Sequence, residues 1–431
     1  MKSALPKVLH GIAGRPMLAH VLGVAKSLGA ARMVVVTAAG AQPVQALAKE
    51  WGADAVEQDR QLGTGHAVLA AERALAGFDG DLLVLFGDAP LLSVATLRRL
   101  TGRLSQGADI SALGFRAADP TGYGRMVAEG DNLIRIVEHK DASAEERCID
   151  LCFAGMLAAK ARMLFELLHQ IGNMNAQGEF YLTDVIAIGE RKGLSCVVVE
   201  GNESEMLGVN SRAQLAAAEA AFQARKRTEL MESGVSMTAP DTVYFSADTV
   251  IEPDAIIGAY VVFGPGVTVR RAAEIRAFCH IEGAEVGEGA IVGPFARLRP
   301  GAVLEESVHV GNFVEVKNAR LEKGAKANHL SYVGDARVGA GTNIGAGTIT
   351  CNYDGENKHQ TDIGADVFIG SDTTLVAPIR IGDGAYIGAG SVITEDVAKD
   401  ALALGRARQV TKPGRAETIR AKNKSRKHRK A

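Results

Sequence analysis

The stretch Val286-Gly287-Glu288-Gly289-Ala290-Ile291-Val292-Gly293-Pro294-Phe295-Ala296-Arg297-Leu298 places an apolar residue at every sixth position. A repeat of this kind is typical of a parallel β-helix, in which each short strand gives one residue to a shared interior and the coils must stack to bury it. A β-sandwich would show alternation with period two instead. The same spacing recurs at Ile257, Phe263, Val269, Ile275, Ile281, Leu304, Val310, Val316, Ile363, Ile369, Leu375, Ile381, Ile387 and Ile393.

The length of the chain indicates more than one domain, and its charge distribution indicates a basic terminus. The chain has 431 residues, 47% of them hydrophobic, with 49 Gly and a single Trp, which suits a thin core of aliphatic side chains. The formal net charge of −2 conceals a basic end, because residues 411–431 hold nine Lys and Arg against one Glu. We expect this basic tail to be a solvated terminus, with docking on polyanions as the alternative.

The cysteines and the hydropathy pattern point to the cytoplasm. The five cysteines form no Cys-x-x-Cys pair, so neither a disulfide framework nor a zinc site is indicated. No apolar run has the length of a membrane span, and no signal peptide precedes the first expected helix. We therefore expect a cytoplasmic protein without integral membrane association. The cysteines are Cys148, Cys152, Cys196, Cys279 and Cys351.

Residues 1–211 alternate between expected strands and helices. Residues 33–37 and 82–86 are continuous apolar runs typical of buried parallel strands, and helices are expected at 18–28, 44–51 and 65–75. Repeated βα units predict a doubly wound, Rossmann-like parallel sheet with ligands at the carboxyl ends of its strands. We expect an α/β domain at 1–211, a helical linker at 212–233, the β-helix at 234–410 and the basic tail at 411–431.

Three polar features stand out in the first half. Asp88 follows the strand at 82–86 and could hold a divalent cation beside phosphates, or cap a turn. The turn at 61–66 is bracketed by Gly and could direct backbone N–H groups at a base or phosphate, although such turns are common. The sequence around Lys7 does not by itself indicate a function for this residue. Singly, none of these features specifies a function.

Six segments, taken together in order, resemble one enzyme family: 1–7, 58 with 61–66, 86–88, 119–125, 136–140 and 208–212. They are similar to the uridyltransferase domain of the bifunctional bacterial N-acetylglucosamine-1-phosphate uridyltransferase/glucosamine-1-phosphate acetyltransferase, and the resemblance continues through the β-helix. It implies that Lys7 binds nucleotide phosphates, that Gln58, Gly63 and Thr64 read uracil, that Gly124 and Glu138 contact the sugar nucleotide, and that Asp88 and Asn210 bind Mg²⁺.

Two features depart from the family pattern. In the family, a Leu-x-x-Gly-x-Gly-Thr-Arg loop with its leading strand comes immediately before the methionine that is residue 1 here, and its backbone N–H groups cradle the triphosphate. For a chain that starts at this methionine we expect slow uridyl transfer. The second departure is Phe153, which stands where the family usually has an Asn that touches the sugar. A phenyl ring can neither donate nor accept that hydrogen bond.

The repeat is interrupted at about 317–362, and interruptions in solenoids often carry function. His329 lies in this interruption, with Arg299 and Lys317 in nearby coils as anion binders. A single histidine is more often a surface residue, but the surrounding segments at 293–301, 311–317, 343–348 and 351–355 match the acetyltransferase half of the same family. The resemblance implies that His329 is the general base, and an imidazole is suited to deprotonating an ammonium.

The resemblance also implies the remaining ligands and the assembly. Family β-helices are left-handed and trimeric, with acetyl-transfer sites between adjacent subunits. Sugar-phosphate contacts are expected from Arg299, Lys317, Tyr332 and Asn343, and acetyl-coenzyme A contacts from Ala346, Asn352, Tyr353, Ser371, Ala389 and Arg406.

The expected function is the synthesis of UDP-N-acetylglucosamine by acetylation of glucosamine 1-phosphate and uridylation of the product, with acetyl-coenzyme A and UTP as co-substrates and no nucleic-acid partner. One alternative is an acetyltransferase with an impaired nucleotidyltransferase domain. Another is a non-catalytic sugar-nucleotide sensor or scaffold, against which the joint presence of His329, Lys317 and Arg299 argues.

Overall fold

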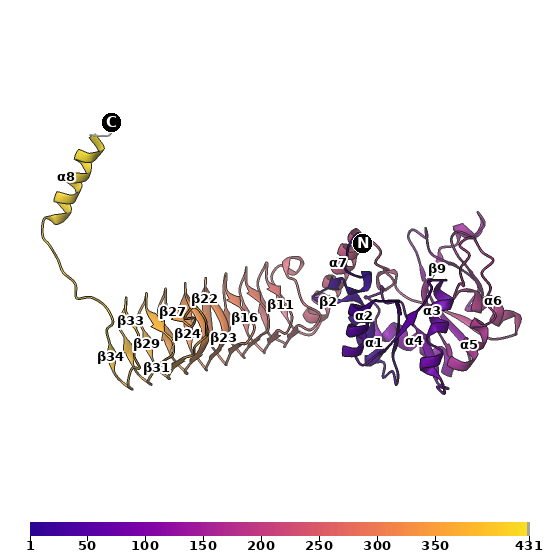
Figure 1. Cartoon of the computed structure of the whole chain (residues 1–431), viewed down its shortest axis with the longest axis horizontal. Helices are drawn as coiled ribbons and strands as arrows, with labels where there is room; N and C mark the ends of the chain where they lie inside the picture. The colour runs from indigo at the N-terminus through magenta and orange to yellow at the C-terminus, as the bar shows by residue number, and fades with distance from the viewer. Residues whose placement is uncertain (429–431) are drawn as a thin grey trace. The chain divides into compact units, whose positions relative to one another are not determined.

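The computed structural model describes residues 1–428 and divides into two compact units (Figure 1). Unit 1 comprises Met1–Glu229 and Tyr244–Ala247, and unit 2 comprises Leu230–Val243 and Asp248–Ala431. The long helix α7 (Arg212–Glu232), expected from a run without Gly or Pro, contributes to both units. Residues 429–431, at the end of the basic tail, lie outside the described part of the chain.

Unit 1 has an α/β fold around a mixed sheet. Six strands lie in the order β5 (Asp81–Val84), β9 (Leu151–Lys160), β6 (Ile110–Arg116), β10 (Cys196–Glu200), β8 (Asn132–Val137) and β7 (Arg125–Glu129). A separate parallel pair is formed by β3 (Val34–Ala38) and β4 (Asp54–Gln58), and a short hairpin by β1 (Gly11–Ile12) and β2 (Arg15–Pro16).

The βα alternation and its apolar strands are confirmed, but the six-stranded sheet is mixed. β10 runs parallel to β6, whereas β9 is antiparallel to both β5 and β6. The hairpin of β7 and β8, which turns at Gly130 with φ +59°, reverses the chain before β9 enters the sheet. β9 is buried at most positions and packs into the main core, so its apolar sequence fits a central strand of either direction.

The helices of unit 1 follow the predicted positions with shifted ends. The helix expected at 65–75 ends at Ala70 and is followed by a 3₁₀ turn. The helices are α1 (Met17–Ser27), α2 (Gln42–Glu50), α3 (Thr64–Ala70), α4 (Val94–Ser105), α5 (Ala161–Leu168) and α6 (Asp184–Arg191), with 3₁₀ turns η1 (Lys7–Leu9), η2 (Arg73–Leu75), η3 (Glu146–Cys148) and η4 (Glu203–Glu205).

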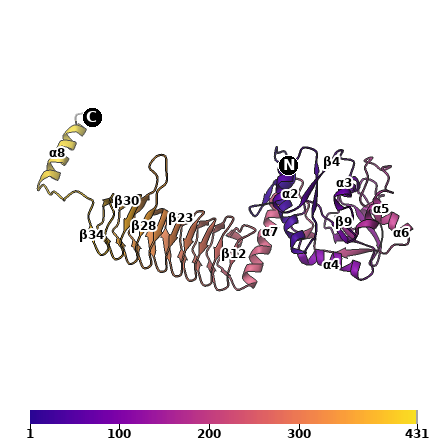
Figure 2. The same ribbon diagram turned by 60° about the horizontal axis from the view of Figure 1, so that its bottom comes forward.

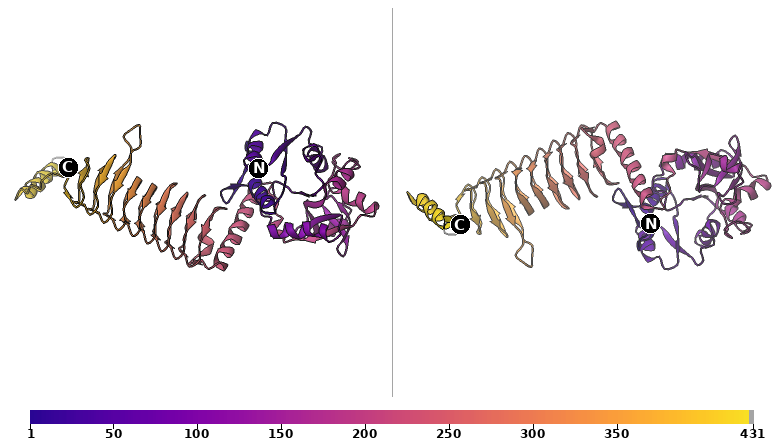
Figure 3. Two further views of the ribbon diagram at one scale, coloured as in Figure 1. Left: turned by 90° about the horizontal axis from the view of Figure 1, so that it is seen from below. Right: turned by 90° about the horizontal axis from the view of Figure 1, so that it is seen from above.

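Unit 2 is a parallel β-helix, and its stacked coils are visible in Figures 2 and 3. The pairing of its strands defines three faces. Every residue of the six-residue repeat named above points into its core, with at most 5% of its surface exposed. The predicted coil architecture is therefore confirmed. Face one contains β11 (Ser236–Met237), β13 (Ile256–Ile257), β16 (Glu274–Ile275), β19 (Ile291–Val292), β22 (His309–Asn312), β24 (Lys326–His329), β26 (Asn343–Ile344), β29 (Phe368–Ile369), β32 (Tyr386–Ile387) and β34 (Leu402–Ala403).

The other two faces share two long strands that bend around their common corner, β23 (Glu315–Leu321) and β25 (Tyr332–Val338). Face two adds β14 (Val262–Phe263), β17 (His280–Ile281), β20 (Arg297–Leu298), β27 (Ile349–Cys351), β30 (Thr374–Val376) and β33 (Val392–Ile393). Face three adds β12 (Val250–Ile251), β15 (Thr268–Val269), β18 (Ala284–Val286), β21 (Ala302–Leu304), β28 (Thr361–Ile363) and β31 (Ile379–Ile381).

Two segments stand apart from the coils. The loop between β27 and β28 projects from the stack (Figure 2). The interruption expected at about 317–362 is therefore much shorter in the structure, because β23 to β27 continue the coils through Cys351. The basic tail, expected as a solvated terminus, includes the helix α8 (Arg415–His428), in which residues 415–426 are exposed. The 3₁₀ turn η5 (Pro240–Thr242) lies in the first coil. Among residues 1–428, no helix combines the length and apolar character needed to cross a bilayer.

Candidate functional site

In unit 1, the structure brings Lys7, Asp88 and Asn210 together. The Lys7 Nζ atom donates to Asp88 Oδ2 at 2.6 Å and to Asn210 Oδ1 at 2.8 Å. Asp88 follows β5 and Asn210 precedes α7, and the N–H of Val209 donates to the Asp88 carbonyl at 3.1 Å, which fixes the two loops against each other. The three residues therefore form one polar cluster at the carboxyl end of a strand, where α/β folds bind ligands.

This cluster fits a divalent cation. Two side-chain oxygens, one from Asp88 and one from Asn210, point to the same place, which the positively charged Lys7 ammonium occupies. Mg²⁺ prefers oxygen ligands and usually completes its octahedron with phosphate oxygens and water, so two protein oxygens are a suitable set. Within the described chain, no group of three or more His, Cys, Asp and Glu side chains is arranged to hold a metal.

The turn at 61–66 is held by unusually close packing. Gly63 has φ +111°, and a Cβ atom there would lie 2.6 Å from the Phe180 carbonyl oxygen, so only Gly fits. The Gln58 Nε2 atom donates to the Gly63 carbonyl at 3.3 Å and lies 2.8 Å from His66 Nδ1. Thr64 Oγ1 accepts from the Leu182 N–H at 3.0 Å. Gln58, Gly63 and Thr64 thus share one rigid turn.

Gly124 and Glu138 lie side by side, and Phe153 is next to them. A Cβ atom on Gly124 would be 3.6 Å from Glu138 Oε2, and the Phe153 N–H donates to the Gly124 carbonyl at 2.8 Å. Burial raises the pKa of Glu138, which accepts a hydrogen bond from Thr183 Oγ1 at 3.1 Å. The Phe153 ring is buried in the main core.

In unit 2, cationic side chains gather beside face two. Lys317 Nζ lies 3.6 Å from Asp335 Oδ2, and Arg299 Nη1 donates to Glu315 Oε1 at 2.9 Å. Lys358, in the projecting loop, neighbours Lys317, and its hydrogen bond with Lys317 and the positive charge of Lys317 lower the pKa of Lys358. The sequence analysis missed Lys358. Its only available signal was the position of a lysine in an insertion that follows the interrupted coil.

Asp335 is the hydrogen-bond acceptor at the centre of this cationic cluster. Its carboxylate accepts hydrogen bonds from Asn318 Nδ2 at 2.6 Å and from Asn352 Nδ2, and Asn352 also donates to the Tyr332 hydroxyl at 3.3 Å. Burial would raise the pKa of Asp335, but the two amide donors and Lys317 together hold it below the usual value. Asp335 therefore stays ionised and fixes Asn352 and Lys317.

His329 ends β24 on face one, at the corner before face two. Its Nδ1 atom lies 2.8 Å from Asn312 Oδ1, the residue beside it in the preceding coil. With that oxygen as acceptor, Nδ1 carries the proton and Nε2 keeps a free lone pair. The side chain is exposed, and within residues 1–428 no hydrogen bond or ion pair joins it to Arg299 or Lys317.

The same corner continues through the residues expected to line the acetyl-coenzyme A site. Successive coils are joined there by Gly347 N–H to the His329 carbonyl at 3.3 Å, Asp372 N–H to Ala346 at 2.7 Å, Gly390 N–H to Ser371 at 2.8 Å and Arg406 Nη1 to Ala389 at 2.8 Å. Asn343 lies on face one in register with Phe368, and Tyr353 is exposed in the projecting loop. His329, Ala346, Ser371, Ala389 and Arg406 thus form one column.

Comparison with known proteins assigns both units. Residues 1–168 match the MobA-like NTP transferase domain, and residues 361–395 match the bacterial transferase hexapeptide model of six repeats. The bifunctional protein GlmU of Jannaschia sp. is 54% identical over 428 residues, covering 99% of this chain and 94% of that protein. Those of Bradyrhizobium sp. and Cereibacter sphaeroides are 54% and 56% identical, covering 97% of this chain and 94% and 92% of theirs.

The chain belongs to the GlmU family. It is a bifunctional transferase, with a nucleotidyltransferase domain in unit 1 and acyltransferase hexapeptide repeats, wound as a left-handed β-helix, in unit 2. A solved UDP-glucose pyrophosphorylase complexed with UDP-glucose is a distant match, 18% identical with a TM-score of 0.42, covering 51% of this chain and 91% of its own. The assignment to the GlmU family does not depend on it.

Proposed function

We propose that this GlmU-family chain makes UDP-N-acetylglucosamine with two separate sites. Unit 2 transfers the acetyl group of acetyl-coenzyme A to glucosamine 1-phosphate. Unit 1 transfers the uridylyl group of UTP to the resulting N-acetylglucosamine 1-phosphate and releases pyrophosphate. The observation that carries the proposal is the presence of two separate polar centres. One is Lys7–Asp88–Asn210 in unit 1, and the other, in unit 2, comprises His329 on its corner and the Lys317–Asp335 pair beside face two.

In the acetylation step, His329 acts as the general base. Its Nε2 lone pair accepts a proton from the sugar ammonium, and the free amine attacks the thioester carbonyl. A C–N bond forms, the C–S bond breaks, and coenzyme A leaves as its thiol. Lys317, Lys358 and Arg299 bind the sugar phosphate, with Tyr332 and Asn343 completing its contacts, because three cations near one point favour a dianion.

The column along the corner supports the acetyl-coenzyme A site. Ala346, Ser371 and Ala389 follow His329 in successive coils, and Arg406 closes the column. A thioester bound along this column, with Asn352 and Tyr353 beside it, would place its carbonyl near His329. The Arg406 guanidinium would then be available to the phosphates of the cofactor.

In the uridylation step, a phosphate oxygen of N-acetylglucosamine 1-phosphate attacks the α-phosphorus of UTP. Asp88 and Asn210 hold Mg²⁺, which when bound offsets the negative charge of the phosphates. Lys7, now paired with Asp88, turns to the nucleotide phosphates when they arrive. The rigid turn with Gln58, Gly63 and Thr64 receives the uracil, and Gly124 with Glu138 receives the sugar.

The proposed assembly is a homotrimer in the cytoplasm. Parallel β-helices that place catalytic residues on an exposed corner need a neighbour to exclude water from the site. The five cysteines are all free thiols in the described chain, as suits a reducing compartment.

Separate assays of the half-reactions test the proposal. Thiol release from acetyl-coenzyme A should require glucosamine 1-phosphate, and pyrophosphate release should require UTP with N-acetylglucosamine 1-phosphate. A chelator should stop the second reaction and leave the first unchanged. Thiol release that continues without the amino sugar, or equal loss of both activities with chelator, would contradict the assignment of two independent sites.

A further inference from the structure

Unit 1 contains an open pocket of about 550 Å³ to which the proposed function assigns no role. Volumes of roughly 300–1,000 Å³ are typical of small-molecule sites. We call it the Trp51 pocket, and its walls come from β2, α1, the end of α2, the loop between β5 and α4, and α7. Its lining includes the cationic side chains of Arg15, Lys26 and Arg225 and, among the described residues, no carboxylate. The pocket is therefore suited to an anion.

The positive charges of the Trp51 pocket are only weakly offset. Within residues 1–428, no ion pair joins Arg15 or Lys26 to a carboxylate. Arg225 has one carboxylate neighbour, Glu229, at 3.9 Å, and its Nη1 atom donates to the Leu91 carbonyl at 2.7 Å, which does not cancel its charge. Clefts lined by charges of one sign concentrate ions of the opposite sign. This pocket should therefore attract anions more strongly than a surface with paired charges does.

Arg15 is held in place by an aromatic ring. Its guanidinium carbon lies 5.6 Å from the centroid of the Trp51 ring, within the range of a cation–π contact. In the part of the chain that the structure describes, no hydrogen bond occupies its N–H groups. A guanidinium presents these groups as a planar fork that matches two oxygens of a phosphate. Arg15 is thus positioned to bind a phosphate group.

His20 also lines the pocket and is 7% exposed. Its Nε2 atom lies 2.9 Å from the Ile12 carbonyl oxygen, which fixes the ring. Burial lowers the pKa of His20, and the charges of Arg15 and Arg225 lower it further, against the opposing effect of the hydrogen bond with Ile12. His20 is therefore neutral near pH 7, and the charge of the pocket comes from its three cations.

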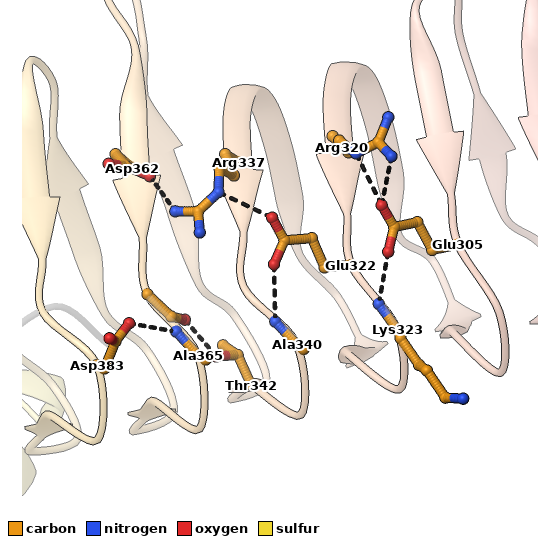
Figure 4. A network of polar contacts seen from close by, with 11 residues as sticks. Glu305, Arg320, Glu322, Lys323, Arg337, Ala340, Thr342, Asp362, Ala365 and Asp383 are labelled. Carbon is orange, nitrogen blue, oxygen red and sulfur yellow. Dashed lines mark hydrogen bonds and ion pairs between the residues drawn. The ribbon is translucent and has the colours of Figure 1, made fainter.

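A pocket of similar size in unit 2 has the opposite charge pattern. It has a volume of about 510 Å³ and is lined by Arg337 and Arg380 but also by Asp362 and Asp396. Arg337 contacts Asp362 at 2.6 Å and Glu322 at 2.9 Å, so carboxylates of adjacent coils already bind its guanidinium (Figure 4). An anion would have to displace these partners. The Trp51 pocket lacks such partners, and this difference favours it as an anion site.

The Trp51 pocket joins two segments of unit 1 that carry candidate site residues. Arg15 belongs to the hairpin of β1 and β2, which follows the 3₁₀ turn η1 that begins at Lys7. Arg225 belongs to α7, which begins two residues after Asn210. An anion bound by both arginines would cross-link the two segments. It would therefore restrain the position of Lys7 relative to Asn210.

We propose that the Trp51 pocket binds a small anion with two or more phosphate groups, at a place separate from the Lys7–Asp88–Asn210 cluster. Three cations match the charge of a diphosphate or triphosphate better than that of a monophosphate. Inorganic polyphosphates and nucleotides both carry such a group. The inference goes beyond the proposed function and does not depend on either half-reaction.

The single tryptophan of the chain provides the measurement. Because Trp51 lines the pocket, its fluorescence should change and saturate when inorganic tripolyphosphate or ATP is added to the whole chain. EDTA in the buffer keeps Mg²⁺ away from Asp88 and Asn210. Calorimetry on the same samples gives the dissociation constant independently of the fluorescence.

Two substitutions in the pocket should weaken binding. Lys26→Gln and Arg15→Gln should each raise the dissociation constant about tenfold, which corresponds to about 1.4 kcal/mol, because each removes one charged contact to phosphate. Lys49→Gln is the matched control, since Lys49 is an exposed lysine in the last turn of α2 that does not line the pocket. Circular dichroism monitors folding, and Lys26 is exposed at the end of α1, so its replacement should not disturb the fold.

Further variants distinguish the pocket from the uridyl-transfer cluster. Lys7→Ala and Asp88→Asn should retain the fluorescence response, whereas its loss in both would place the anion at that cluster and overturn the inference. Equal weakening by Lys26→Gln and Lys49→Gln, or no saturable change with either anion up to about 1 mM, would also overturn it. Tighter binding of ATP than of tripolyphosphate would identify a nucleotide as the ligand, and equal binding would identify the phosphate chain alone.

Discussion

The candidate site of unit 1 joins Lys7 to Asp88 and Asn210, which lie 81 and 203 positions away in the chain, whereas neighbouring site residues of the β-helix lie 17 apart, as in Asn312 with His329 and Asp335 with Asn352. The first site depends on the packing of a whole domain. The second is assembled by local stacking, so a change in one coil should be felt mainly by its neighbours. The following substitutions test this difference between the two sites, beginning with the largest expected effect.

His329→Ala should reduce acetyl transfer by roughly 10²–10⁴-fold, the usual contribution of a positioned base. Uridyl transfer should not change, because the two centres are independent. His280→Ala is the control, since His280 is an exposed histidine of another coil whose nearest carboxylate, on Glu282, is 3.9 Å away. A loss of less than about threefold, measured as thiol release, would remove His329 from the base role.

Asp88→Asn should reduce uridyl transfer by about a hundredfold, the scale of losing one electrostatic contact to developing charge. It keeps the shape of the side chain but removes the charge that Lys7 meets at 2.6 Å. Asp81→Asn is the control, because its ion pair with Lys160 is also 2.6 Å but lies at the other end of β5 and is well exposed. Pyrophosphate release that falls equally in both variants would indicate damage to the strand instead.

Lys358→Ala should raise the KM for glucosamine 1-phosphate by about tenfold and leave the KM for acetyl-coenzyme A unchanged, as expected from losing one of several charged contacts to a phosphate. Lys358→Arg should restore most of the affinity. Lys323→Ala removes an exposed lysine paired with Glu306 on another part of the coil and should have no effect. Unchanged kinetics in the Lys358→Ala variant would show that the projecting loop does not reach the substrate.

Glu138→Gln should stabilise unit 1 at alkaline pH. Because burial raises the pKa of Glu138, the folded protein holds its proton more tightly than the unfolded chain, and stability falls as pH rises from the ordinary glutamate range through the raised value. Gln stays neutral, so its unfolding midpoint at pH 8 should be higher by about 2–4 °C. Melting curves at a series of pH values should converge near pH 4, below the ordinary glutamate pKa of about 4.3.

The β-helix could be predicted from the sequence outside 317–362, because the six-residue repeat there records the core positions of the strands. Within that range the core residues Leu321, Ala327 and Val333 depart from the repeat, and the coils continue nevertheless. In unit 1, the sequence located Asp88 at the end of a strand, but it could not show that β9 runs antiparallel, since a buried strand has the same apolar pattern in either direction. The contact of Lys358 with the cationic cluster depends on how an insertion folds back.

The projecting loop suggests how a solenoid acquires new parts. Asp354 accepts hydrogen bonds from the N–H groups of Glu356 and Asn357 and pairs with His359 at 2.6 Å, while the His359 N–H donates to the Asn352 carbonyl at 2.8 Å. These contacts lie within the loop, and the strands on either side rejoin their faces in normal register. An insertion that holds its own shape is portable: it could be transplanted between coils of related proteins without redesign of the scaffold that carries it.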